Sequence, residues 1–295
     1  MYESIVLGIV LAILGATLGS FGAATVWRLR ARQLVADQKE GEPVDKKELK
    51  RLKPLVKGAF GMKDHSRCLH CGYELKWYDL IPIISWVTLR GKCRNCHTKI
   101  GWFELLMEIG VALFFVGSYV LWPDGLDSGL AIAHFSLWLA AGFIMAMLFA
   151  YDAKWYLLPN VLTLALAVVG LAIVGVATVE TQDVGGTLLS ALGAVLVLSG
   201  LYAVLYVVSK GRWVGFGDVK LGFGLGLILI DWQLALAALF LANFIGCLIV
   251  IPLMVTKKLQ PTSHIPFGPL LIAGAVLAWF IGWPVIEGYL AIIGI

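Results

Sequence analysis

Long apolar runs are the feature that most limits how this chain can fold. Several of them exceed the roughly 20 apolar residues that an α-helix needs to cross a bilayer. We predict eight membrane-spanning helices, at residues 4–26, 102–122, 129–150, 159–179, 187–208, 215–230, 232–255 and 268–291. Only 14% of the 295 residues are charged, whereas a soluble domain carries about 25%. The sequence therefore predicts an all-α polytopic membrane protein, whose first run is a retained helix and not a cleaved signal peptide.

The basic residues predict the orientation of these helices. Of the 23 Lys and Arg residues, 17 lie between Arg28 and Lys99. With eight spans and the N-terminus outside, every basic residue falls on the cytoplasmic side or at its boundary. The opposite loops contain acidic residues and no basic residue, which is the positive-inside pattern. The sixth span is short, because only ten apolar residues precede Asp231, but merging it with the seventh would place Lys257 and Lys258 outside. We therefore keep eight spans.

One long polar segment interrupts the apolar runs. The two ends of this polar segment divide the chain into a first transmembrane helix (1–26), a basic cytoplasmic loop (27–101) and a seven-helix membrane core (102–295). The first half of the loop is rich in both acidic and basic residues, which is typical of a solvated helix or a flexible linker. The alternatives are attraction to anionic lipid headgroups and alignment of a basic substrate.

Four cysteines form two CxxC pairs in the second half of this loop. The pairs are separated by 21 residues and comprise Cys68, Cys71, Cys93 and Cys96. Each pair can give two thiolates to one metal, and four thiolates complete the tetrahedral shell of a structural Zn²⁺ site. The predicted topology places them in the reducing cytosol, which disfavours disulfides. Free or redox-active thiols are the alternative, and three nearby histidines can replace a ligand: His65, His70 and His97. Cys247, within an apolar span, is expected to be a buried hydrophobe.

Two aspartates stand at the predicted cytoplasmic ends of membrane helices. Asp152 ends the third span in MLFAYDAKWYLLPN, and Asp218 begins the sixth in GFGDVKLG. Acids at such positions are costly and usually functional. Two carboxylates at one depth can share a proton, so that one acts as general base on a water, as in aspartic proteases. Gly215 and Gly217 would allow a sharp turn and a close approach of a substrate strand.

Each acid also has a simpler interpretation. Asp152 can form an interfacial ion pair with Lys154, and Asp218 can be a helix N-terminal acid favoured by the macrodipole. The matched depth and the glycines favour the catalytic pair. The PFGP segment at 266–269 either breaks the chain before the last span or lines the same site, and we expect the neighbouring His264 to be interfacial.

These blocks together resemble a known family. GFGD at 215–218 resembles the GxGD pattern of membrane aspartyl proteases. Type IV prepilin peptidases have similar blocks in the same order, and the blocks of this chain are LGSFGAATVWRLR, SRCLHC with IPIISWVTLRGKCRNC, DAKWYLLPNVLT, GFGDVKLGFGLG and IPFGPLLIAG. The resemblance covers nearly the whole chain.

The resemblance implies a bacterial inner-membrane (plasma-membrane) enzyme with eight helices. It would cleave the short basic leader from type IV prepilins and pilin-like secretion proteins, after a glycine and on the cytoplasmic side. In bifunctional members the enzyme then methylates the new N-terminus with S-adenosylmethionine. Asp152 and Asp218 correspond to the catalytic pair, and Cys68, Cys71, Cys93 and Cys96 to the zinc ligands.

Three other functions stay open at this point. A signal-peptide-peptidase-like intramembrane protease shares the Tyr151-Asp152 and GxGD sequences, but it cuts deeper in the bilayer and lacks the cysteine block. A transporter would use its acids to relay protons or bind a cation nearer the midplane. A non-catalytic membrane scaffold would use the zinc loop for docking only.

Overall fold

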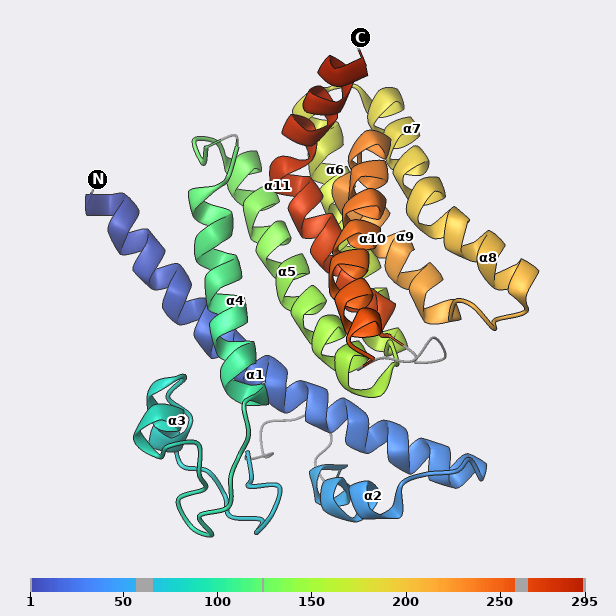
Figure 1. Ribbon diagram of the computed structural model, residues 1–295. Helices are drawn as coiled ribbons and strands as arrows, with labels where there is room; N and C mark the ends of the chain where they lie inside the picture. Colours follow the sequence, from blue (N-terminus) through green and yellow to red (C-terminus); the bar gives the residue numbers. More distant parts are fainter. Residues whose placement is uncertain (1, 57–65, 124, 258–264, 294–295) are drawn as a thin grey trace. The chain divides into compact units, whose positions relative to one another are not determined.

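The computed structural model describes residues 2–56, 66–123, 125–257 and 265–293, nearly all of them helical or in short turns (Figure 1). In these ranges the only extended pairings are two isolated bridges in the cysteine loop. The chain forms two compact units, Met1–Val120 and Leu121–Ile295. The division into three segments that we predicted from composition stays a prediction.

The first unit is built on two long helices, α1 (Tyr2–Glu40) and α4 (Phe103–Val120), which pack along each other. Two glycines of α1 make this packing close. A Cβ on Gly15 would lie 2.7 Å from the Ala112 Cα, and one on Gly19 would lie 2.5 Å from the Met107 carbonyl oxygen. Small residues that let backbones approach are typical of membrane helix pairs.

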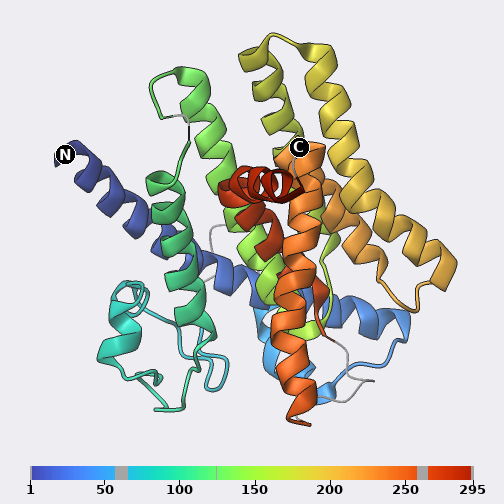
Figure 2. The ribbon, with the colours of Figure 1, turned by 45° about the horizontal axis from the view of Figure 1, so that its top comes forward.

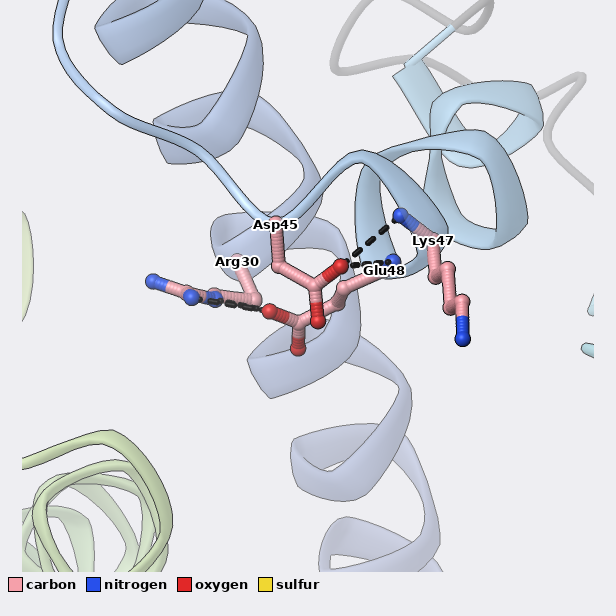
Figure 3. Close-up of polar contacts among 4 residues, drawn as sticks. All are labelled: Arg30, Asp45, Lys47 and Glu48. Carbon is pink, nitrogen blue, oxygen red and sulfur yellow. Dashed lines mark hydrogen bonds and ion pairs between the residues drawn. The ribbon is translucent and has the colours of Figure 1, made fainter.

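The described part of the loop after α1 folds back on that helix. The short helix α2 (Lys46–Leu52) is capped by Asp45, whose Oδ1 accepts the N–H groups of Lys47 and Glu48. The guanidinium of Arg30 on α1 donates to Glu48 at 2.8 Å, and both side chains are largely buried (Figure 3). Of the two structures expected for this half of the loop, the described residues adopt the helix. The 3₁₀ turn η1 (Lys53–Val56) continues α2.

The second unit is a bundle of antiparallel helices. Its elements are α5 (Gly129–Trp155), α6 (Asn160–Thr181), α7 (Val184–Val195), η3 (Leu196–Gly200), α8 (Leu201–Ser209), α9 (Phe216–Leu229), α10 (Trp232–Val255) and α11 (Phe267–Ile293). The central helix is α9, which contacts α6, α7, α10 and α11. Its glycines permit this: a Cβ on Gly222 would lie 2.7 Å from the Leu198 carbonyl oxygen, and one on Gly226 would lie 2.8 Å from the Val195 Cα.

The predicted fold class is confirmed, although one of the predicted membrane spans is a short helix. Seven helices of the described chain are long and apolar enough to cross a membrane. The eighth predicted span is α9, whose 14 residues extend about 21 Å at 1.5 Å per residue. The chain breaks at Ile230, and the side chain of Asp231 caps α10. Spans six and seven are therefore separate helices, as the charge pattern required. The first helix runs past its predicted end at residue 26, to Glu40.

Candidate carboxylate site and cysteine cluster

Asp152 lies in the last turn of α5, where only 6% of its surface is exposed. The helix ends because Tyr156 adopts a left-handed conformation (φ 57°), and the Tyr156 N–H returns to the Asp152 carbonyl at 2.8 Å. The Asp152 carboxylate points towards the start of α11, where its Oδ2 accepts the Gly268 N–H at 3.0 Å. A backbone group of a distant segment therefore holds this buried acid.

Asp218 lies in the first turn of α9 and is half-buried. Its Oδ2 accepts the N–H of Gly215 at 3.2 Å, which closes the first turn of the helix. The ammonium group of Lys220 donates to Asn160 Oδ1 at 2.7 Å and not to this acid. Lys154, which we considered as an ion-pair partner of Asp152, has its ammonium group 5.1 Å from the centre of the Trp155 ring.

The fold brings the two acids to one end of the second unit. The end of α5 and the starts of α9 and α11 lie at the same end of the bundle (Figures 1 and 2). The connection between α5 and α6 packs on the start of α9, because Leu158 adjoins Gly217 and Asn160 binds Lys220. The two carboxylates are close enough for their charges to interact. Such a pair can share one proton and can offer a general base and a general acid to one water molecule.

Gly268 is the residue of this site that the sequence did not single out. It lies in the first turn of α11, where backbone N–H groups have no partner within the helix. A Cβ at this position would lie only 2.7 Å from Asp152 Oδ2. The chain break expected at PFGP therefore holds for Pro266, which directly precedes the helix, whereas Pro269 lies inside the first turn of α11. The same segment also contacts the acid. The signal in the sequence that could have pointed to Gly268 was its position between two prolines. His264 lies outside the described residues.

The two glycines named from the sequence have a different backbone from the one expected. Gly215 has φ −77° and ψ 151°, and neither Gly215 nor Gly217 adopts a positive φ. The sharp turn lies earlier, at Lys210 (φ 51°) and Gly211 (φ 75°). Gly217 instead packs closely on Leu158, because a Cβ there would lie 3.1 Å from that of Leu158. The turn expected at Gly215 and Gly217 is thus corrected, whereas their role in substrate approach stays a prediction.

The four cysteines of the first unit form one cluster, which we call the cysteine cluster (Cys68, Cys71, Cys93 and Cys96). Their sulfur atoms all lie within 4.8 Å of one another. Sulfur–sulfur distances are 3.9 Å for Cys68 and Cys96 and 4.0 Å for Cys71 and Cys93. A tetrahedron with metal–sulfur bonds of about 2.3 Å has edges of about 3.8 Å. The donor set therefore fits a tetrahedral metal ion.

The two CxxC pairs lie in separate backbone turns of the same kind. In the first pair the Cys68 N–H donates to the Tyr73 carbonyl, and in the second the Cys93 N–H donates to the Thr98 carbonyl, both at 2.9 Å. The residue after the second cysteine is left-handed in both, Gly72 with φ 73° and His97 with φ 55°. His97 thus occupies the position of a turn glycine, and neither it nor His70 belongs to the cluster.

The surroundings of the cluster shift the pKa values of two of its thiols in opposite directions. Burial raises the pKa of the Cys68 thiol to about 12. The hydrogen bond with the Thr98 hydroxyl, at 3.4 Å, lowers the pKa of the Cys96 thiol to about 6. The Asn95 amide also donates to Cys71 Sγ at 3.7 Å. Hydrogen bonds to sulfur favour the thiolate, which is the form that binds metal.

The loop that carries the cluster is joined to α4 by a buried acid. Glu108 of α4 accepts the Ile83 N–H at 2.7 Å. Ile83 has φ 63°, which is rare for a β-branched residue. It precedes the short helix α3 (Ile84–Thr88), and the 3₁₀ turn η2 (Trp77–Asp79) lies just before it. The sequence predicted neither the strained residue nor its partner.

Fold and site together define a polytopic helical membrane protein with a carboxylate pair in one unit and a cysteine cluster in the other. The family described as bacterial peptidase A24 N-terminal domain matches residues 13–122, and the type IV leader peptidase family matches residues 138–251. The second match includes both aspartates, and the first includes all four cysteines. The chain belongs to the type IV leader peptidase family.

Several curated proteins are similar over most of their length. A prepilin leader peptidase/N-methyltransferase of Burkholderia pseudomallei is 31% identical over 226 residues, which cover 74% of this chain and 68% of the relative. A type 4 prepilin-like proteins leader peptide-processing enzyme of Escherichia coli is 29% identical, with 89% of each chain covered. A prepilin leader peptidase/N-methyltransferase of Pseudomonas aeruginosa is 28% identical, over 96% of this chain and 93% of the relative. No solved structure shows significant similarity.

Proposed function

We propose that this chain is a membrane aspartyl endopeptidase that removes the short basic leader from type IV prepilins and pilin-like secretion proteins. The observation that carries the proposal is the carboxylate pair of Asp152 and Asp218, assembled from two helices at one end of the second unit and held by two backbone N–H groups. Membership of the family and the names of the relatives support it.

The pair would cleave the peptide through an activated water. One aspartate, ionised, takes a proton from water as the water oxygen bonds to the scissile carbonyl carbon. The electron pair displaced from the C=O bond moves to the carbonyl oxygen, which takes the proton of the other aspartate. Collapse of this intermediate breaks the C–N bond, and the amine leaves with a proton from the pair. The products are the leader carboxylate and the new N-terminal amine of the pilin.

The topology suits such a substrate. A prepilin has a basic leader in the cytosol and an apolar helix in the membrane, so its scissile bond lies at the cytoplasmic boundary. We place Asp152 and Asp218 at that boundary, with the N-terminus outside and the cysteine loop in the cytoplasm. The distribution of basic residues supports this orientation in a bacterial inner membrane.

We further propose that the cysteine cluster binds one structural Zn²⁺ through Cys68, Cys71, Cys93 and Cys96. Four thiolates leave no open position, so the ion would stabilise the loop and take no part in cleavage. A second activity, N-methylation of the processed pilin with S-adenosylmethionine as methyl donor, is proposed from the names of the relatives. A mass increase of one CH₂ unit on the processed N-terminus would reveal it.

Co-expression with a prepilin tests the peptidase. Wild type should convert the precursor to a faster-migrating product, and mass spectrometry should place the cut after a glycine. Asp218→Asn keeps the acceptor for the Gly215 N–H but cannot ionise, so it should abolish cleavage without loss of expression. Asp231→Asn is the matched control, because this acid caps α10 through backbone N–H groups and Asn caps helices equally well. Full cleavage by Asp218→Asn would remove the proposed mechanism.

A further inference from the structure

A buried hydroxyl group beside the carboxylate pair has no function in the mechanism above. Tyr202 of α8 is 4% exposed. Its hydroxyl oxygen is buried and has no hydrogen-bond partner among the described residues. Buried polar groups are normally hydrogen-bonded, so an unpaired donor in a well-packed region calls for an explanation.

The packing places this tyrosine between the segments that carry the site. Its ring contacts Phe267, with the ring centres 5.3 Å apart. Phe267 directly precedes Gly268, the residue that binds Asp152. The Tyr202 hydroxyl is also close enough to Asp218 for an electrostatic interaction. One unpaired donor thus lies near both the anchor of one acid and the carboxylate of the other.

A π-helical turn accounts for this placement. The chain from α7 to α8 is interrupted by the π turn η3 (Leu196–Gly200), and Tyr202 comes two residues later. One extra residue in a turn rotates all later side chains by roughly 100° around the helix axis. The same turn is fixed to α9, because the Ser199 hydroxyl donates to the Val219 carbonyl at 2.9 Å. The π turn therefore determines the direction of Tyr202 relative to Asp218.

We propose that Tyr202 is a further catalytic residue, whose hydroxyl donates a hydrogen bond to the carbonyl oxygen of the scissile peptide. This inference rests on the proposed peptidase function. No acceptor for the hydroxyl is found among the described residues, and a substrate at the aspartates would bring one. That oxygen gains negative charge as water attacks, so a fixed donor binds the transition state more strongly than the substrate. No proton is transferred from the tyrosine, and the steps written above stay balanced.

Replacement of the hydroxyl alone tests the assignment. Tyr202→Phe keeps the ring and its contact with Phe267. In proteoliposomes with a purified prepilin, we expect kcat to fall by about 10²-fold with little change in KM, as for the loss of one oxyanion donor. The matched control is Tyr206→Phe, one turn later on α8, whose ring contacts Phe216 with centres 5.4 Å apart. This control should cleave as wild type does.

Two further readouts separate catalysis from packing. The melting temperature of Tyr202→Phe should equal or exceed that of wild type, because the buried hydroxyl has no partner among the described residues whose loss would destabilise the fold. 3-Fluorotyrosine at position 202, which keeps the hydroxyl, should restore most of the rate. Wild-type kcat for Tyr202→Phe, or a loss of rate that follows a loss of melting temperature, would overturn the assignment. Absence of cleavage by wild type in the same assay would instead reject the proposed function.

Discussion

The contact between Gly268 and Asp152 allows a sharp prediction for Gly268→Ala. The added Cβ would lie 2.7 Å from Asp152 Oδ2 and 3.2 Å from its Cγ. An ordinary contact of this kind begins at 3.4 Å, so the carboxylate or the start of α11 has to move by about 0.7 Å. That movement is comparable with the 1 Å misplacement that costs about 10²-fold in rate.

We therefore expect Gly268→Ala to lower kcat by about 10- to 100-fold. The fold should survive, because alanine is a better helix former than glycine by about 1 kcal/mol and only one side chain has to yield. The assay follows prepilin cleavage in proteoliposomes over time, with the melting temperature of each variant measured in parallel.

Gly288→Ala is the matched control on the same helix. Its added Cβ would meet nothing within 4 Å, so cleavage should equal that of wild type. Wild-type cleavage by Gly268→Ala, in protein of normal stability, would refute the reasoning that this glycine sets the position of Asp152. Equal losses in both variants would show that the effect does not come from the contact with Asp152 and would refute it too.

The cysteine cluster gives two further predictions. Cys68→Ser should reduce bound zinc, measured by atomic emission, from about one ion per chain to near none, because a structural site needs four ligands. Cys247→Ser is the control outside the cluster and should leave bound zinc unchanged; we expected Cys247 to be buried, but its side chain is exposed. Unchanged zinc in Cys68→Ser would contradict the assignment. His97→Gly should keep its zinc and melt at the same or a higher temperature, since the left-handed residue (φ 55°) costs roughly 1 kcal/mol with a side chain; loss of zinc would mean that the histidine is a ligand.

Hydrophobic length and charge were enough to predict the helices. Crossing a bilayer is a local requirement that each apolar run meets alone, and the break at Asp231 followed from the position of Lys257 and Lys258. The continuation of α1 to Glu40 was missed because the apolar run ends near residue 26, whereas beyond it only scattered apolar residues such as Ala31 and Leu34 are buried. Arg30 and Glu48, which hold that part together, are separated by a turn that the pattern does not encode.

The candidate site was predictable only in part, for a physical reason. Carboxylates at helix ends and CxxC pairs have chemistry that their sequence context already indicates. The supporting groups do not: the Gly268 N–H acts only because α11 begins beside α5, and Tyr202 faces α9 only because a π turn precedes it. The glycines at 215 and 217 were assigned a turn because glycine permits one, whereas the close packing of Gly217 on Leu158 follows only from the fold.

The central claim, that Asp152 and Asp218 act as one unit, is tested most directly by their combined replacement. Cleavage rates would be measured in proteoliposomes for wild type, Asp152→Asn, Asp218→Asn and the double variant. Residues that act as a unit give strongly non-additive losses. The account predicts that each single variant loses about as much rate as the double variant. Substantial cleavage by either single variant, or losses that multiply in the double variant, would contradict it.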